Sequence, residues 1–214
     1  GPTTLNQIIF RDNNSDFLGG AIVSASSLDI SDALFINNHA GFQGGAIYQY
    51  TNTATVSRTT FEANTSDARA GAVYVASGAT FDVSQSLFYL NESGSRGGAI
   101  FNEGTVISTN TTFSANHSGS RGGAILNEGT LTVVNNTLTD NTADQTGGGI
   151  SNSAGGFVTL VNTIVAGNSG AQGNPDLGGV YDSATSFNNL VGDIGGATGL
   201  TDAVNGNIIG SLLS

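Results

Sequence analysis

Apolar and small residues recur along the chain with a period of about 25 residues. In each unit an apolar residue is followed three positions later by Asn. Seven positions after that Asn comes a Gly that opens a Gly-Ala-Ile sequence or a close variant. The three positions are occupied by Phe10, Phe35, Phe61, Phe88, Phe113 and Leu138, by Asn13, Asn38, Asn64, Asn91, Asn116 and Asn141, and by Gly20, Gly45, Gly71, Gly98, Gly123 and Gly148. A seventh copy, Val165 with Asn168, keeps only the first half.

Each unit contains short runs rich in Val, Ile, Thr and Phe, separated by Gly, Asn, Asp and Ser, and no helical period of useful length. Three strands of four or five residues with three turns use about 25 residues, which is one coil of a parallel β-helix. A leucine-rich repeat would show a Leu framework, and a propeller blade needs nearly twice the length. The sequence therefore predicts an all-β fold, a single solenoid domain of about seven three-strand coils.

Stacking of the coils would place equivalent residues about 4.8 Å apart, in columns of like side chains. We expect three inward columns: the Phe positions, the Ile of Gly-Ala-Ile, and a third set formed by Leu5, Ile30, Val56, Val83, Val133 and Leu160, with Ser108 as the exception. The Asn residues from Asn13 to Asn141 are expected to form a hydrogen-bonded ladder in a turn. The paired Gly residues would permit a tight corner.

The domain organisation follows from where the repeat is regular. Gly1-Pro2 is typical of the scar of a cleaved tag, residues 3–169 are the predicted β-helix repeats, and residues 170–214 are a predicted irregular coil or cap. We expect the chain to be a segment of a larger protein. The sequence has no apolar run of about 18 residues, so we expect no direct insertion into a membrane.

Charge and composition reduce the number of functions that the chain could have. A formal net charge of −11 with 5 basic residues argues against a nucleic-acid partner, because phosphate binding needs a dense basic surface. The absence of Cys excludes disulfides and thiolate metal sites. The oligomeric state does not follow from the sequence.

The paired motifs F-x-x-N and G-G-A-I resemble the repeat of chlamydial polymorphic outer-membrane proteins over roughly residues 8–168. The tail from Gly173 resembles the closing segment of secreted bacterial β-helix proteins of the choice-of-anchor Q kind. These resemblances imply a right-handed parallel β-helix, secreted or displayed on a bacterial surface as a passenger. They also imply adhesion to a glycan or to a protein on a host or neighbouring cell.

Three arginines, Arg69, Arg96 and Arg121, stand two residues before the second Gly of their units, so they should form one column. Such a column needs anionic partners, and we expect Asp67 and Glu92 to supply them, with Glu103 and Glu128 too distant. One interpretation is a cationic stripe that binds the carboxylate or sulfate of a glycan. The other is a surface ladder of salt bridges.

The residue after each column Ile should point outward. It would form an apolar and aromatic strip that includes Tyr48, Tyr74 and Phe101. The full column is Val23, Tyr48, Tyr74, Phe101, Leu126 and Ser151. In register, exposed aromatic rings suit a sugar or a protein partner. Alternatively, a neighbouring loop or domain covers them.

Metal binding and catalysis have little support in the sequence. His39 and His117 would lie three coils apart, too far to share one metal, and no other zinc-like spacing occurs. Acidic residues could hold Ca²⁺ weakly. They are Asp12, Asp16, Asp140, Asp144 and Asp176. No other cofactor is expected.

A structural and adhesive passenger is the function that the sequence favours. The alternative is a polysaccharide lyase or hydrolase, or its substrate-binding portion, although no pair of carboxylates or Ser-His-Asp set breaks the repeat. An ice-binding Thr array is disfavoured, because Asp29 and Asp82 interrupt the Thr column.

Overall fold

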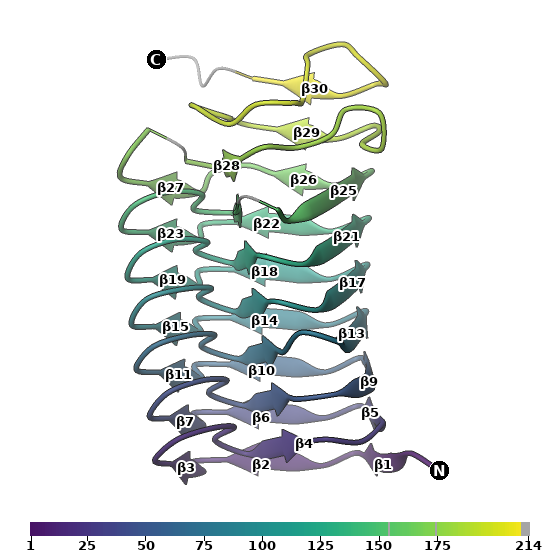
Figure 1. The fold of residues 1–214 in the computed structure, drawn as a ribbon, viewed down its shortest axis with the longest axis vertical. Coiled ribbons are helices and arrows are strands. Elements are labelled where there is room, and N and C mark those ends of the chain that lie inside the picture. Colours follow the sequence, from purple (N-terminus) through teal and green to yellow (C-terminus); the bar gives the residue numbers. More distant parts are fainter. Residues whose placement is uncertain (154, 174, 211–214) are drawn as a thin grey trace.

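The computed structural model describes residues 1–153, 155–173 and 175–210. Within them the chain forms one all-β domain, a parallel β-helix built from four sheets that run along its length (Figure 1). Every strand pairs in parallel with the strand one coil away. No helix in the described part of the chain is long and apolar enough to cross a membrane.

The four sheets are named by the order in which the chain reaches them. Sheet 1 consists of β1 (Thr3–Asn6), β5 (Leu28–Ser31), β9 (Asn52–Ser57), β13 (Ala79–Ser84), β17 (Thr105–Thr109), β21 (Thr130–Val134) and β25 (Phe157–Val161). Sheet 2 consists of β2 (Ile9–Arg11), β6 (Leu34–Ile36), β10 (Thr60–Glu62), β14 (Leu87–Tyr89), β18 (Thr112–Ser114), β22 (Thr137–Thr139), β26 (Ile164–Val165), β29 (Leu190–Val191) and β30 (Ile208–Ile209).

The other two sheets are shorter in the strand direction. Sheet 3 consists of β3 (Asn14–Ser15), β7 (His39–Ala40), β11 (Thr65–Ser66), β15 (Glu92–Ser93), β19 (His117–Ser118), β23 (Thr142–Ala143) and β27 (Ser169–Gly170). Sheet 4 consists of β4 (Ile22–Ser24), β8 (Ile47–Gln49), β12 (Val73–Val75), β16 (Ile100–Asn102), β20 (Ile125–Asn127), β24 (Ile150–Asn152) and β28 (Leu177–Gly179).

The predicted fold is confirmed. In Figure 1 the chain passes from sheet 4 in front to sheet 1 on the right, sheet 2 behind and sheet 3 on the left as it rises, which is a right-handed course. Strands β1 to β28 make seven coils in the described residues. Each coil has the three expected strands and, in addition, the two-residue strand of sheet 3 directly after the ladder Asn.

Repetition in sequence becomes repetition in space, because the register joins equivalent residues without a shift. Phe61 pairs with Phe35 and Phe88, Val73 with Ile47 and Ile100, and Val56 with Ile30 and Val83. The Phe rings stack with centroids 4.6–4.8 Å apart from Phe10 to Phe113. The three predicted columns thus form one continuous apolar core.

Ser108, the exception in the third column, is fully buried at the place of an aliphatic residue. Its hydroxyl accepts a hydrogen bond of 2.6 Å from Nδ2 of Asn136, which is also buried. In adjacent coils Thr111 and Thr163 occupy the position of Asn136, so the repeat accepts a Thr at this position.

Replacement Ser108→Val is therefore expected to destabilise the protein by about 1–2 kcal/mol, because it leaves a buried amide without its acceptor. The double variant Ser108→Val with Asn136→Thr should recover most of that loss, since both columns then follow the repeat. Urea denaturation of the two variants and the wild type measures the difference. A single variant as stable as the wild type would show that this hydrogen bond contributes nothing.

The coil pattern continues beyond residue 169 in a reduced form. β27 and β28 complete the seventh coil, and β29 and β30 extend sheet 2 beyond it. Val191 adds to the core, and Leu177 extends the Ile column. Sheet 1 ends at β25, so the last part of the chain covers the end of the core with turns and short strands.

Candidate functional site

The candidate residues lie on one wall of the solenoid, formed by the outer face of sheet 4 and by the return segments. A return segment is the stretch between the sheet 3 strand and the sheet 4 strand of one coil, such as residues 94–99. Within it Gly97 has a φ of 67°, and a Cβ on Gly98 would overlap the carbonyl oxygen of Gly123. The first Gly is therefore needed for backbone conformation. The second is needed because two coils approach closely.

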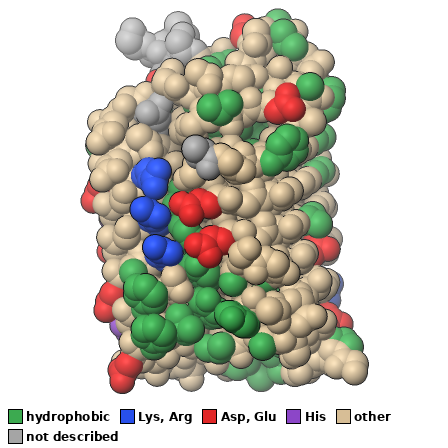
Figure 2. Space-filling model, in the orientation of Figure 1, with side chains coloured by type: hydrophobic (Ala, Val, Ile, Leu, Met, Phe, Trp, Pro, Cys, Tyr) green, Lys and Arg blue, Asp and Glu red, His purple; other side chains and the backbone are tan. Residues whose placement is uncertain are grey.

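The three arginines form the predicted column. Single parallel bridges join Arg69 to Arg96 and Arg96 to Arg121. Figure 2 shows the three basic side chains one above another, beside two acidic ones.

The predicted partners of this column are wrong. Nη1 of Arg69 lies 3.7 Å from Oε1 of Glu103, and Nη1 of Arg96 lies 3.5 Å from Oε1 of Glu128. Asp67 instead lies 3.8 Å from His39, and Glu92 is an exposed residue of β15. Arg69 and Arg96 therefore each reach along the axis to the glutamate of the next coil. Partly exposed pairs of this kind contribute about 0.2–1 kcal/mol each.

The aromatic strip points outward as predicted, but it is covered, which is the alternative interpretation, and not exposed. Its side chains point away from the main core, but Tyr74 is 3% exposed, and Phe101 and Leu126 are completely buried. They form a second apolar cluster with Tyr48, Ala70 and Ala76. The return segments cover this cluster, and the guanidinium of Arg69 lies 5.3 Å from the ring centroid of Phe101. Of the predicted column, Val23 in the first coil is exposed.

Tyr48 and Tyr74 stack with centroids 4.8 Å apart beneath the arginines. Burial raises the pKa of Tyr74 well above its ordinary value, and a hydrogen bond with Glu103 raises this pKa further. Burial likewise raises the pKa of Tyr48. Both phenols therefore stay neutral near pH 7. Glu103 and Arg69 therefore lie at the polar end of Tyr74, at the edge of the second cluster.

The predicted asparagine ladder is confirmed. Oδ1 of Asn91 accepts hydrogen bonds from the backbone N and from Nδ2 of Asn64. Nδ2 of Asn91 donates to Oδ1 of Asn116 and to the carbonyl of Phe61. The same pattern runs from Asn13 through Asn168, and the members from Asn38 to Asn141 are fully buried. The ladder therefore holds the coils together and leaves no amide free for a ligand.

A second amide ladder, which the sequence interpretation missed, lies at the end of sheet 4. Nδ2 of Asn102 donates to Oδ1 of Asn127, and Nδ2 of Asn127 donates to Oδ1 of Asn152. Its signal was the Asn of the repeated phrase N-E-G-T together with Asn152, one period later.

Neither histidine is part of a metal site in the described residues, which contain no group of three potential His, Cys, Asp or Glu ligands. Nδ1 of His39 lies 2.9 Å from the hydroxyl of Thr65, and His117 repeats this contact with Thr142. Of the acidic residues, Asp176 is completely buried at the end of the main ladder.

An exposed aromatic patch covers the first two coils of the same wall. It comprises Phe17, Leu18, Val23, Phe42 and Tyr50, of which Phe17 is 62%, Val23 57% and Tyr50 56% exposed. The rings of Phe17 and Phe42 stack with centroids 5.4 Å apart. Figure 2 shows hydrophobic side chains gathered here, below the arginine column. Phe17 and Phe42, spaced by one period, were the signal that the sequence interpretation did not use.

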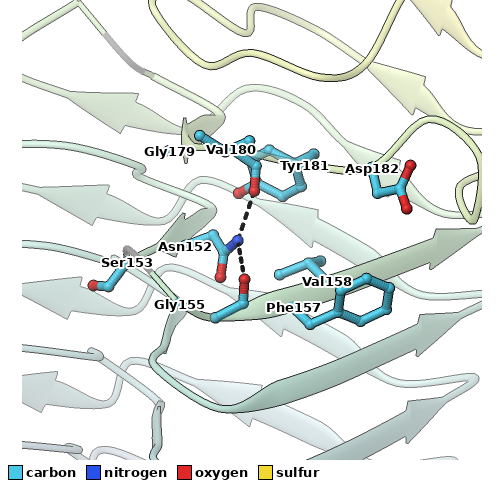
Figure 3. A pocket seen from close by; sticks show the side chains of 10 residues that line it. Asn152, Ser153, Gly155, Phe157, Val158, Gly179, Val180, Tyr181 and Asp182 are labelled. Atoms are coloured by element: carbon cyan, nitrogen blue, oxygen red, sulfur yellow. Dashed lines mark hydrogen bonds between the residues drawn. The ribbon is translucent and has the colours of Figure 1, made fainter.

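A pocket of about 370 Å³ opens near the other end of the wall (Figure 3). It is lined by Asn152, Ser153, Phe157, Val158, Tyr181 and Asp182, together with glycines and Val180. Nδ2 of Asn152 donates to the carbonyls of Gly156 and Val180, so the end of the second ladder forms the back of the pocket.

Comparison with known families gives one match. Residues 32–49 and 110–128 match the repeat of the Chlamydia polymorphic membrane protein. Each matched segment runs from the turn before a sheet 2 strand to the end of sheet 4 in the same coil, and so contains both F-x-x-N and G-G-A-I. The chain is similar to this repeat. No curated protein and no solved structure matches the chain.

Proposed function

We propose that this chain is a passenger-type segment of a bacterial surface or secreted protein. As a stiff rod, it would present one wall to a ligand on another cell. The similarity to polymorphic membrane protein repeats supports a surface-associated role. The parallel β-helix supports a rod, since seven coils at about 4.8 Å each extend roughly 35 Å.

The exposed aromatic patch carries the binding part of the proposal. Large apolar side chains clustered on the surface of a protein with a net charge of −11 mark a surface that another molecule covers. The exposed carboxylate of Asp16 directly precedes Phe17 of the patch. Because Phe17 and Phe42 cover one face of each other's ring, the patch suits apolar side chains better than the flat face of a sugar. The ligand that fits is a protein whose apolar side chains are flanked by Lys or Arg.

The arginine column contributes less than the sequence suggests. Arg69 and Arg96 are engaged by Glu103 and Glu128, and the rings of Tyr48, Tyr74 and Phe101 are covered. These residues support the wall rather than contact the ligand. A passenger is favoured over a polysaccharide-active enzyme, because the family whose repeat matches supports a surface role and Glu103 and Glu128 on this wall are engaged by arginines.

Adhesion of protein-coated beads to cultured animal cells tests the proposal. The variant Phe17→Ser with Phe42→Ser is expected to lower bead adhesion at least about tenfold, since two aromatic contacts are lost. Trypsin treatment of the cells should abolish adhesion, whereas glycosidase treatment should not.

The matched control is Ile164→Thr with Leu190→Thr. These two residues are exposed on sheet 2, away from the wall, and are register partners on neighbouring strands. This variant should adhere like the wild type. The proposal fails when coated beads adhere no better than bare ones, or when both double variants lose adhesion equally.

A further inference from the structure

Arg121 departs from the pattern of the other two arginines. Arg69 and Arg96 each pair with the glutamate that follows the sheet 4 strand one coil further on. The register of Asn102, Asn127 and Asn152 shows that Ser153 takes the place of that glutamate for Arg121. In residues 1–153, 155–173 and 175–210, Arg121 forms no ion pair.

Ser153 has unused hydrogen-bonding capacity. Its hydroxyl oxygen is buried and has no hydrogen-bond partner in the described part of the chain. Figure 3 shows the side chain turned away from Tyr181 and Asp182. The guanidinium of Arg121 therefore lacks the carboxylate that Arg69 and Arg96 have, because Ser153 is too short to reach it.

Ser153 also lines the pocket shown in Figure 3. The pocket volume of about 370 Å³ is in the range of small-molecule sites and is enough for a sugar ring. Phe157, which is 46% exposed, offers an apolar ring face, and the carbonyl and carboxylate oxygens around Asp182 can accept hydrogen bonds from hydroxyls. The carboxylate of Asp182 would repel an anionic group at its own end of the pocket. An acidic sugar would therefore direct its carboxylate toward Arg121.

We propose that Arg121 binds the carboxylate of a uronic acid residue in an acidic glycan, in the space that the short Ser153 side chain leaves where the preceding coils carry a glutamate, and that the sugar ring lies in the adjacent pocket. The ligand carboxylate takes the place that Glu103 and Glu128 take beside Arg69 and Arg96. A uronate is favoured over an acidic peptide, because the pocket combines one exposed aromatic ring with acceptors for hydroxyl groups. This site lies at the other end of the wall from the aromatic patch and does not depend on it.

Isothermal titration of the whole protein tests the site with three probes: a trisaccharide that contains one glucuronate, its neutral glucose counterpart, and a short Glu-containing peptide. The glucuronate probe should bind, and the neutral probe should bind at least about tenfold more weakly, because a charge-assisted hydrogen bond is lost. Arg121→Gln should weaken glucuronate binding about tenfold.

Ser153→Glu is the sharper variant, because it supplies an internal carboxylate to Arg121. It should abolish glucuronate binding while its melting temperature stays at or above that of the wild type. Arg69→Gln, two coils away, is the matched control and should change the affinity by less than about twofold. Equal binding of glucuronate and neutral probes, no binding of either, equal losses in Arg121→Gln and Arg69→Gln, or a peptide that binds as tightly as glucuronate would each overturn the proposal. None of these outcomes bears on the separate proposal that the aromatic patch mediates adhesion.

Discussion

Replacement Asn91→Asp is expected to lower the free energy of unfolding by about 4–5 kcal/mol, although it changes a single NH₂ group to oxygen. Nδ2 of Asn91 lies 2.9 Å from the carbonyl oxygen of Phe61 and 2.9 Å from Oδ1 of Asn116. An Asp would place a carboxylate oxygen between these two acceptors, in a fully buried site. Two hydrogen bonds are lost, and a charge is buried without a partner.

The loss should depend on pH in a defined direction. Burial and the two acceptors favour the protonated acid, so the pKa of the introduced carboxyl should rise above its unfolded value. The folded protein then binds the proton more tightly, and the defect should be smallest at acid pH and grow as pH increases through the raised pKa.

The matched control is Asn110→Asp, which makes the same chemical change at an exposed residue of the next coil. Asn110 has a φ of 51°, and Asp32 occupies the equivalent turn with a φ of 54°. The control should stay within about 0.5 kcal/mol of the wild type. Urea denaturation at several pH values measures both variants. A defect in Asn91→Asp no larger than in the control would show that the ladder is not a source of stability.

The ladder and the core columns could be predicted because they depend only on the period. In a parallel β-helix every coil repeats the path of the one before it, so recurrence of Phe61 and Asn64 in sequence becomes contact in space. Even the break at Ser108 was visible in the sequence. Its partner Asn136 was not, because it lies in a different column of the repeat.

The wall could not be predicted in the same way. Alternation along a strand distinguishes the two faces of sheet 4, but it does not tell whether another segment covers the outer face. The return segment folds back over that face and buries Tyr74 and Phe101. Exposure therefore depends on which side chains the return segment carries. In the first coil it carries Phe17 and Leu18, and Val23 stays exposed.

The partners of the arginines were missed for a related reason. Glu92 is four residues from Arg96 in sequence and Glu128 is 32 residues away, yet Glu128 forms the ion pair. In this fold the neighbour along the axis is closer than the neighbour beyond a turn of the chain. Proximity in this fold therefore follows the coil register, which places Ser153 in the coil next to Arg121 at the position of the missing glutamate.

The structure gives Asp176 a different role from the one that the sequence suggested. From the sequence it was one of several acids that could bind Ca²⁺ weakly. In the structure, Oδ1 accepts hydrogen bonds from the backbone N and Nδ2 of Asn168, and Oδ2 accepts one from the backbone N of Asp193. Asp176 therefore ends the asparagine ladder and connects it to the last part of the chain.

Replacement Asp176→Asn is accordingly expected to destabilise the C-terminal end by about 2–3 kcal/mol. An Asn can keep the two bonds from Asn168 only by turning its NH₂ group toward the N–H of Asp193, which leaves two donors facing each other. Hydrogen exchange of residues 176–210 should therefore become faster, with less change in the first coils, because coupling in a solenoid is mainly between neighbours. Asp182→Asn is the matched control. Oδ1 of Asp182 accepts the N–H of Ala184, and an Asn keeps that acceptor.

The pH dependence of the stability difference between the wild type and Asp176→Asn gives a second test. Burial raises the pKa of Asp176 above 3.8, although the hydrogen bonds to Asp193 and Asn168 oppose the shift. The stability that this group contributes is therefore complete below about pH 3.8 and decreases as pH rises through the raised pKa. Because Asn does not titrate, the advantage of the wild type over Asp176→Asn should narrow between acid and neutral pH, while the bond to Asp193 keeps it above zero at pH 7. An advantage that widens with increasing pH would mean that the three hydrogen bonds outweigh burial and hold the carboxylate charged at the end of the ladder.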